Sequence, residues 1–95
     1  MLITDTNEHK ELFEKAIRVW GIESQKAMAI GECGEFLAEF GRTAQNRSSP
    51  EKMIDEIADV IIMMNQMALI YGSDAVKERI LYKIGKITDK LKKHE

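Results

Sequence analysis

Turn-forming residues, cysteine and aromatic residues are all scarce in this sequence. Among its 95 residues there are one proline, six glycines and one cysteine, and aromatic residues make up 6%. A chain so poor in turn formers and so rich in Lys, Glu, Ala, Ile and Met is typical of a mostly helical protein. Because Cys33 is the sole cysteine, an internal disulfide is excluded, and two histidines are too few for zinc-finger spacing.

The sequence also lacks an excess of either charge and any long apolar run. Sixteen acidic residues against 14 basic ones give a net charge of −2, which argues against a protein that binds duplex nucleic acid by counterion release. The longest uninterrupted apolar run, residues 60–64, is too short to cross a membrane, and the first ten residues lack a secretory-signal pattern. We therefore expect a cytoplasmic, reduced protein with a single domain over residues 1–95.

Apolar residues recur at helical spacing in four segments. The expected helices cover roughly residues 8–20, 24–43, 50–71 and 75–92. Gly21 and Gly72 mark the ends of the first and third helices, and residues 44–49 form the one convincing loop. The candidate caps at the helix starts are Asp5 or Thr6, Ser49 before Pro50 or a capping box of Ser48 with Glu51, and Ser73 or Asp74.

The third expected helix is apolar almost all round from Ile57 onward. A helix of this kind has to be buried on most sides. Three other short helices give too little cover in a chain of this size. We therefore predict that self-association supplies the missing contacts, as an obligate dimer or higher oligomer.

Two pairs of acidic residues stand out by their position. Glu32 and Glu35 lie three residues apart in the middle of the second expected helix, and Glu56 and Asp59 lie three apart in the third. This spacing puts both members of a pair on one helix face. Because the two helices flank one short loop, we expect them to pack antiparallel, so that four carboxylates converge on one point.

Taken alone, either acidic pair is most often a solvated helix face. Here the second pair adjoins the apolar stretch 60–62, and Gly31 and Gly34 bracket the first pair. Glycine inside a helix costs about 1 kcal/mol relative to alanine, so two glycines here indicate a close approach of backbone or ligand. Oxygen ligands without His or Cys select a hard cation, Mg²⁺ or alternatively Mn²⁺, over zinc.

The two motifs together resemble the signature of the MazG-like all-α nucleoside triphosphate pyrophosphohydrolases, which is ExxE on one helix and ExxD on the next. Here the signature reads Glu32-Cys33-Gly34-Glu35, then twenty residues, then Glu56-Ile57-Ala58-Asp59. The flanks are similar too: Trp20-Gly21 with Gln25 before the first motif, and DEIADVIIMMNQMALIYG around the second. The likeness covers roughly residues 19–91. One departure is Gly31, because many relatives have Glu-Glu at the start of the first motif.

The resemblance implies a four-helix MazG-like bundle, completed by oligomerisation into a homodimer or homotetramer, that hydrolyses an NTP or dNTP to the monophosphate and pyrophosphate. Mg²⁺ would be held by Glu32, Glu35, Glu56 and Asp59. A water activated by a carboxylate would attack the α-phosphate. The general base is either Glu32 or Glu35, and the sequence does not choose between them.

Two lysines of the fourth expected helix are candidate substrate contacts. Lys83 and Lys86 lie three residues apart and either meet the β- and γ-phosphates or form a solvated basic face. Cys33 lies inside the acidic motif, a setting that disfavours the thiolate, so we expect no nucleophilic role for it.

Three amide side chains and one tryptophan are further candidates for contact with the substrate. Gln66 lies seven residues after Asp59 and so on nearly the same helix face, whereas Asn65 is offset by about 100°. Gln25 and Trp20 are candidates for reading or stacking on a base, although a tryptophan is more often found in a core or interface.

Two other functions stay open. A non-catalytic helical dimerisation or regulatory module explains the apolar third helix but leaves the four acids without a purpose. A related enzyme that acts on phosphoribosyl-ATP is the other alternative. A di-iron carboxylate bundle is set aside, because it needs Glu-x-x-His pairs and both His9 and His94 lie outside the acidic motifs.

Overall fold

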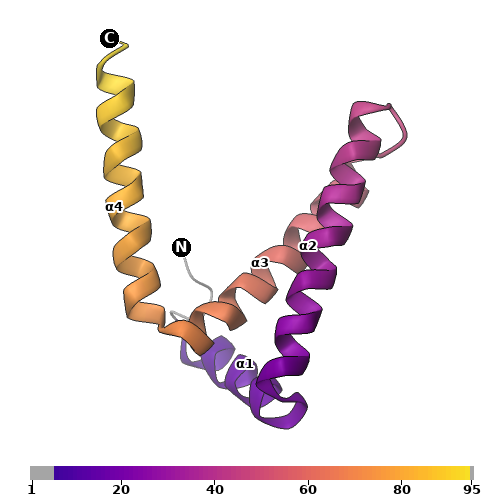
Figure 1. Ribbon diagram of the computed structural model, residues 1–95, viewed down its shortest axis with the longest axis vertical. Coiled ribbons are helices and arrows are strands. Elements are labelled where there is room, and N and C mark those ends of the chain that lie inside the picture. The colour runs from indigo at the N-terminus through magenta and orange to yellow at the C-terminus, as the bar shows by residue number, and fades with distance from the viewer. Residues whose placement is uncertain (1–5, 95) are drawn as a thin grey trace.

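The computed structural model describes residues 6–94, and these residues form four helices and no strand (Figure 1). The helices are α1 (Asn7–Trp20), α2 (Ile22–Ala44), α3 (Pro50–Tyr71) and α4 (Ser73–Lys92). The prediction of an all-helical chain is therefore confirmed. The bounds of α3 are the expected ones, and those of the other helices differ from the prediction by one or two residues.

Single glycines form two of the three corners between helices. Gly21 has a φ of 93° and Gly72 a φ of 119°, a region that side-chain-bearing residues rarely adopt. The N–H of Gly21 donates to the carbonyl of Ile17, and the N–H of Gly72 donates to that of Ala68, both at 2.8 Å. Each glycine thus ends one helix and lets the next begin at once.

The caps differ in part from the predictions. Ser49 caps α3, because its Oγ accepts a hydrogen bond from the N–H of Lys52 at 3.3 Å. The capping box of Ser48 with Glu51 is therefore wrong by one residue. Ser73 or Asp74 as the cap of α4 is also wrong, because both lie inside the helix and Gly72 takes the cap position. Thr6 occupies the cap position of α1, although its side chain makes no capping hydrogen bond, and Asp5 lies outside the described residues.

An antiparallel hairpin of α2 and α3 forms the main body of the chain (Figure 1). Residues 45–49 join the two helices, and Asn46 in this loop has a φ of 56°, a value that asparagine tolerates better than most residues. The predicted antiparallel packing of these two helices is confirmed. Helix α1 lies at the other end of the hairpin and contacts both α2 and α3.

The apolar core of the single chain is small. The buried apolar residues among those described are Phe13, Ala29, Met63 and Ala68. Along α3, by contrast, a stripe of large apolar side chains is exposed: Ile54, Ile57, Ile61 and Met64. Residues 6–94 of one chain thus do not supply the cover that this apolar helix requires, and self-association stays a prediction.

Helix α4 stands away from the hairpin and packs against α3 at its first turns (Figure 1). None of its residues is buried. The radius of gyration is 16.0 Å, whereas a compact chain of this length has a value near ~12 Å. Within residues 6–94, no helix combines the length and the apolar character that crossing a membrane demands.

Candidate metal centre

Polar side chains occur at three levels along the α2–α3 hairpin. In an antiparallel pair, residues whose numbers have the same sum lie level with one another. The hydrogen bond shared by Glu32 and Asp59 sets the register of the two helices. This register puts Gln25 level with Gln66 seven residues away, and Glu39 level with Lys52 seven residues the other way. Seven residues are about two helical turns, so the levels are spaced by about 10 Å along one helix face. We call these six residues the polar seam.

Three carboxylates meet between the middle level of the polar seam and the next turn of α3, where Glu56 is level with Glu35 by the same sum. Glu32 of α2 and Glu56 and Asp59 of α3 each place one oxygen so that all three lie within 4.8 Å of one another. Glu32 and Glu56 are half-buried, and Asp59 is exposed. One carboxylate of α2 and two of α3 thus lie together, and we call these three residues the acid triad.

Glu35, the fourth predicted ligand, lies outside the acid triad. Its side chain is exposed, one turn along α2 from Glu32. It remains close enough for its charge to raise the pKa of both Glu32 and Glu56. The structure therefore brings three of the four predicted acids into direct proximity and leaves the fourth beside them with access to solvent.

Proton affinity is raised at two members of the acid triad. Burial is the main cause of the raised pKa of Glu32, and Asp59 raises it further by charge repulsion and by a shared hydrogen bond. Burial also raises the pKa of Glu56, with the charge of Asp59 next in importance. Both effects disfavour the ionised forms in the absence of a compensating positive charge.

The donor set of the acid triad fits a hard divalent cation. All three ligands are carboxylate oxygens, which is the chemistry that Mg²⁺ and Mn²⁺ prefer. Oε2 of Glu56 is buried and accepts no hydrogen bond from any residue between 6 and 94. A buried carboxylate oxygen without a donor is costly, and a bound cation would remove that cost.

The amide candidates are buried at or near the polar seam. Gln25 is 1% exposed, and its amide donates weakly to the sulfur of Met28 at 3.8 Å. Gln66 is 5% exposed, and its Oε1 accepts no hydrogen bond among the described residues. Asn65 is also buried but donates to the carbonyl of Ile61 at 2.8 Å. Of these amides, Gln66 therefore has the clearest unmet capacity to bind a ligand.

The remaining candidates lie away from the acid triad in the single chain. Lys83 and Lys86 are on α4, which has no packing contact with α2, and Lys86 lies over the ring of Tyr82 at 5.1 Å. Trp20 is exposed at the end of α1, where it lines an apolar groove with Leu12 and Val19. One chain therefore does not bring these residues together with the acids.

Sequence reasoning missed one acidic residue of the polar seam. Glu39 is 5% exposed and pairs with the guanidinium of Arg42 at 2.9 Å. This hydrogen bond, with smaller contributions from Ser48 and Lys52, holds the pKa of Glu39 below its ordinary value. Its position seven residues after Glu32 is a signal that was available, because that spacing repeats a helix face. Since Arg42 already neutralises Glu39, this acid does not extend the acid triad.

The glycines beside the first motif have no close neighbour. A Cβ added at Gly31 or Gly34 would meet nothing within 4 Å among the described residues outside the helix itself. Residues 6–94 therefore do not make the close approach that these glycines indicate.

Comparison of the chain with protein-family models, with curated proteins and with solved structures finds no match in any of the three.

Proposed function

We propose that this chain is a Mg²⁺-dependent nucleoside triphosphate pyrophosphohydrolase, which cleaves an NTP or dNTP to the monophosphate and pyrophosphate. The convergence of Glu32, Glu56 and Asp59 from two helices is the observation that carries the proposal. A triphosphate has about four negative charges, so an acidic site binds it only through a bridging cation. The resemblance of the two motifs to MazG-like enzymes supports the same reaction.

The acid triad would hold the cation, and the cation, when bound, polarises the α-phosphate and neutralises the phosphate charge. Glu35 is the base that we assign, because it is an exposed carboxylate beside the triad and not a member of it. It accepts a proton from the attacking water as the new bond to the α-phosphorus forms. The bond from the α-phosphorus to the α–β bridging oxygen breaks, and pyrophosphate leaves with that oxygen.

Gln66 and Gln25 would contact the substrate from the neighbouring level of the polar seam. The proposal includes a homodimer or homotetramer in the cytoplasm, in which the four helices of each chain complete a bundle with those of another. The large exposed apolar surface also favours a second candidate, a helical dimerisation module without catalysis.

The deciding experiment measures pyrophosphate release from canonical, deoxy- and modified nucleoside triphosphates and from phosphoribosyl-ATP, with and without Mg²⁺. Asp59→Asn should weaken Mg²⁺ binding and activity together. Glu35→Gln should lower kcat by about 10²–10⁴-fold while Mg²⁺ binding is retained. Glu51→Gln, an exposed acid at the start of α3, is the matched control and should leave activity unchanged.

The proposal fails if every triphosphate survives intact or if Asp59→Asn is as active as the wild type. If only Glu35→Gln retains full activity, the assignment of the base is wrong and Glu32 takes its place.

A further inference from the structure

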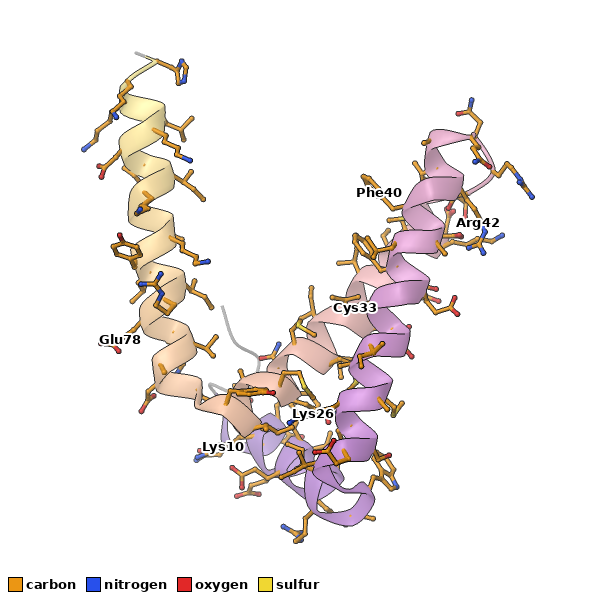
Figure 2. The ribbon with its side chains drawn as sticks, viewed as in Figure 1. Lys10, Lys26, Cys33, Phe40, Arg42 and Glu78 are labelled. Carbon is orange, nitrogen blue, oxygen red and sulfur yellow. The ribbon has the colours of Figure 1, made fainter. Side chains whose placement is uncertain are left out.

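Helix α4 carries an apolar face that the described residues cover only in part, at its first turns. Its members recur at helical spacing: Val76, Ile80, Ile84, Ile87 and Leu91. The last three are about half exposed or more. Glu78, which lies about 160° around the helix from Ile80, points away from the hairpin in Figure 2, so the apolar face is turned toward it. A soluble helix rarely keeps such a face in water.

The α2–α3 hairpin, which forms one arm of the chain while α4 forms the other, is apolar on this side as well. Figure 2 shows Cys33 and Phe40 on the side of α2 that is turned toward α4. Phe40 is exposed, as is the α3 stripe that begins at Ile54 and ends at Met64. The two arms diverge from the corner at Gly72, so they do not cover each other within one chain (Figure 1).

The exposed area of the chain is larger than that expected for a compact monomer of the same mass. The chain exposes 7238 Å². A compact monomer of 10.9 kDa is expected to expose about 5,600 Å². The excess of about 1,600 Å² per chain falls in the range that obligate dimers bury, and exceeds the ~800 Å² per partner of a standard interface.

The charges of the two arms are complementary. Helix α4 has six basic and three acidic side chains, a net charge of +3. Helices α2 and α3 together have eight acidic and three basic side chains, a net charge of −5. Packing α4 against α4 of another copy would bring like charges together, whereas packing α4 against the hairpin pairs opposite charges.

We infer that the two arms are the two halves of one self-association surface, in which α4 of each chain packs against the α2–α3 hairpin of a second copy. The 20-residue α4 spans about 30 Å, close to the length of the 22-residue α3. Each chain gives its α4 to the hairpin of the other and receives the other's α4 in return, and we call this arrangement the exchange. One two-fold axis therefore covers both apolar arms of both chains. This inference specifies the homo-oligomer of the proposed function, and it does not require catalysis.

Crosslinking between two differently tagged chains tests the exchange directly. One chain keeps its natural Cys33, and the other has Cys33→Ala together with Ile84→Cys. A short thiol-specific crosslinker should join the two chains, because the inference places α4 of one copy on the α2 side of the other. The matched control has Cys33→Ala with Glu78→Cys, on the opposite side of α4, and should give far less of the mixed product.

Sedimentation of two further variants provides a second readout. Ile84 and Tyr82 are 49% and 51% exposed in the single chain, but lie about 160° apart around α4. Ile84→Asp should raise the dimer dissociation constant by at least about 30-fold, because it buries a charge at the interface. Tyr82→Asp should leave association unchanged. Circular dichroism establishes that both variants retain their helices.

Three results would overturn the inference. They are a wild-type chain that sediments as a monomer, equal crosslinking at positions 84 and 78, and equal effects of Ile84→Asp and Tyr82→Asp on association. Because neither readout involves nucleotides, loss of hydrolysis in an associated chain would count against the proposed function and not against the exchange.

Discussion

Replacing Gln66 by methionine distinguishes the effect of this side chain on folding stability from its effect on ligand affinity. Gln66 is 5% exposed, and its Oε1 accepts no hydrogen bond from residues 6–94. Such a residue lowers stability unless a partner arrives. Methionine has nearly the same length and volume, so the substitution removes the polar group without leaving a cavity.

The magnitude follows from the cost of a buried, unsatisfied acceptor, about 1–3 kcal/mol. We expect Gln66→Met to raise the free energy of unfolding by about 1–2 kcal/mol, once a small packing loss is subtracted. For a chain of this length, each kcal/mol corresponds to about 4–8 °C in Tm. If Gln66 contacts the nucleotide, the same variant should bind it about tenfold more weakly.

Thermal and urea unfolding of the free protein and titration with a nucleoside triphosphate would measure the two effects. The matched control is Asn65→Leu, at the adjacent buried amide. Because Asn65 already donates to the carbonyl of Ile61, its removal should lower stability by about 0.5–1.5 kcal/mol. A Gln66→Met variant that is less stable than the wild type would refute the reasoning on the unmet acceptor, and unchanged nucleotide affinity would refute its role in binding.

Two further predictions concern charge. The raised pKa values of Glu32 and Glu56 stabilise the cation-free protein most below their ordinary value of 4.5, and that contribution is lost as the pH rises through the raised values. Mg²⁺ should therefore raise Tm increasingly from acid to neutral pH, by an amount equivalent to about 2.7 kcal/mol at 100 times its Kd; a pH-independent shift in melting curves would exclude binding at these acids. Because the pKa of Glu39 is lowered, its ionised form stabilises the fold at pH values above its ordinary pKa. This contribution to stability is lost as the pH falls through the lowered pKa. Arg42→Ala should therefore destabilise the protein near neutral pH and much less in acid, as measured by urea unfolding at several pH values, and an equal loss at every pH would contradict the assignment to this pair.

Local signals account for most of the helical structure that was predicted. Gly21 and Gly72 end α1 and α3 because a positive φ is needed at each corner, and Pro50 begins α3 because its missing N–H costs nothing at that position. The start of α4 was misplaced because Ser73 and Asp74 are good caps by type. The glycine corner makes them unnecessary, since α4 begins immediately after α3 ends.

The candidate site was only partly accessible from the sequence. Spacing by three residues placed each acidic pair on one face, and the short loop set the antiparallel order. Which acids meet depends on the register and rotation of two helices of about six turns each, and a shift of one residue turns a side chain by about 100°. That rotation brings Glu32 to Glu56 and Asp59 and leaves Glu35 exposed beside them.

Residue types and their periodicity are enough to specify four helices, their order and the two acidic motifs, because these properties depend on neighbours within a few residues. Tertiary structure decided three things that no local pattern encodes. It buried the side chain of Glu39, placed the Oε1 of Gln66, unpaired among residues 6–94, inside the hairpin, and turned α4 away from the rest of the chain. Each of these depends on how much surface one small chain can bury, and 95 residues leave both arms of this protein exposed.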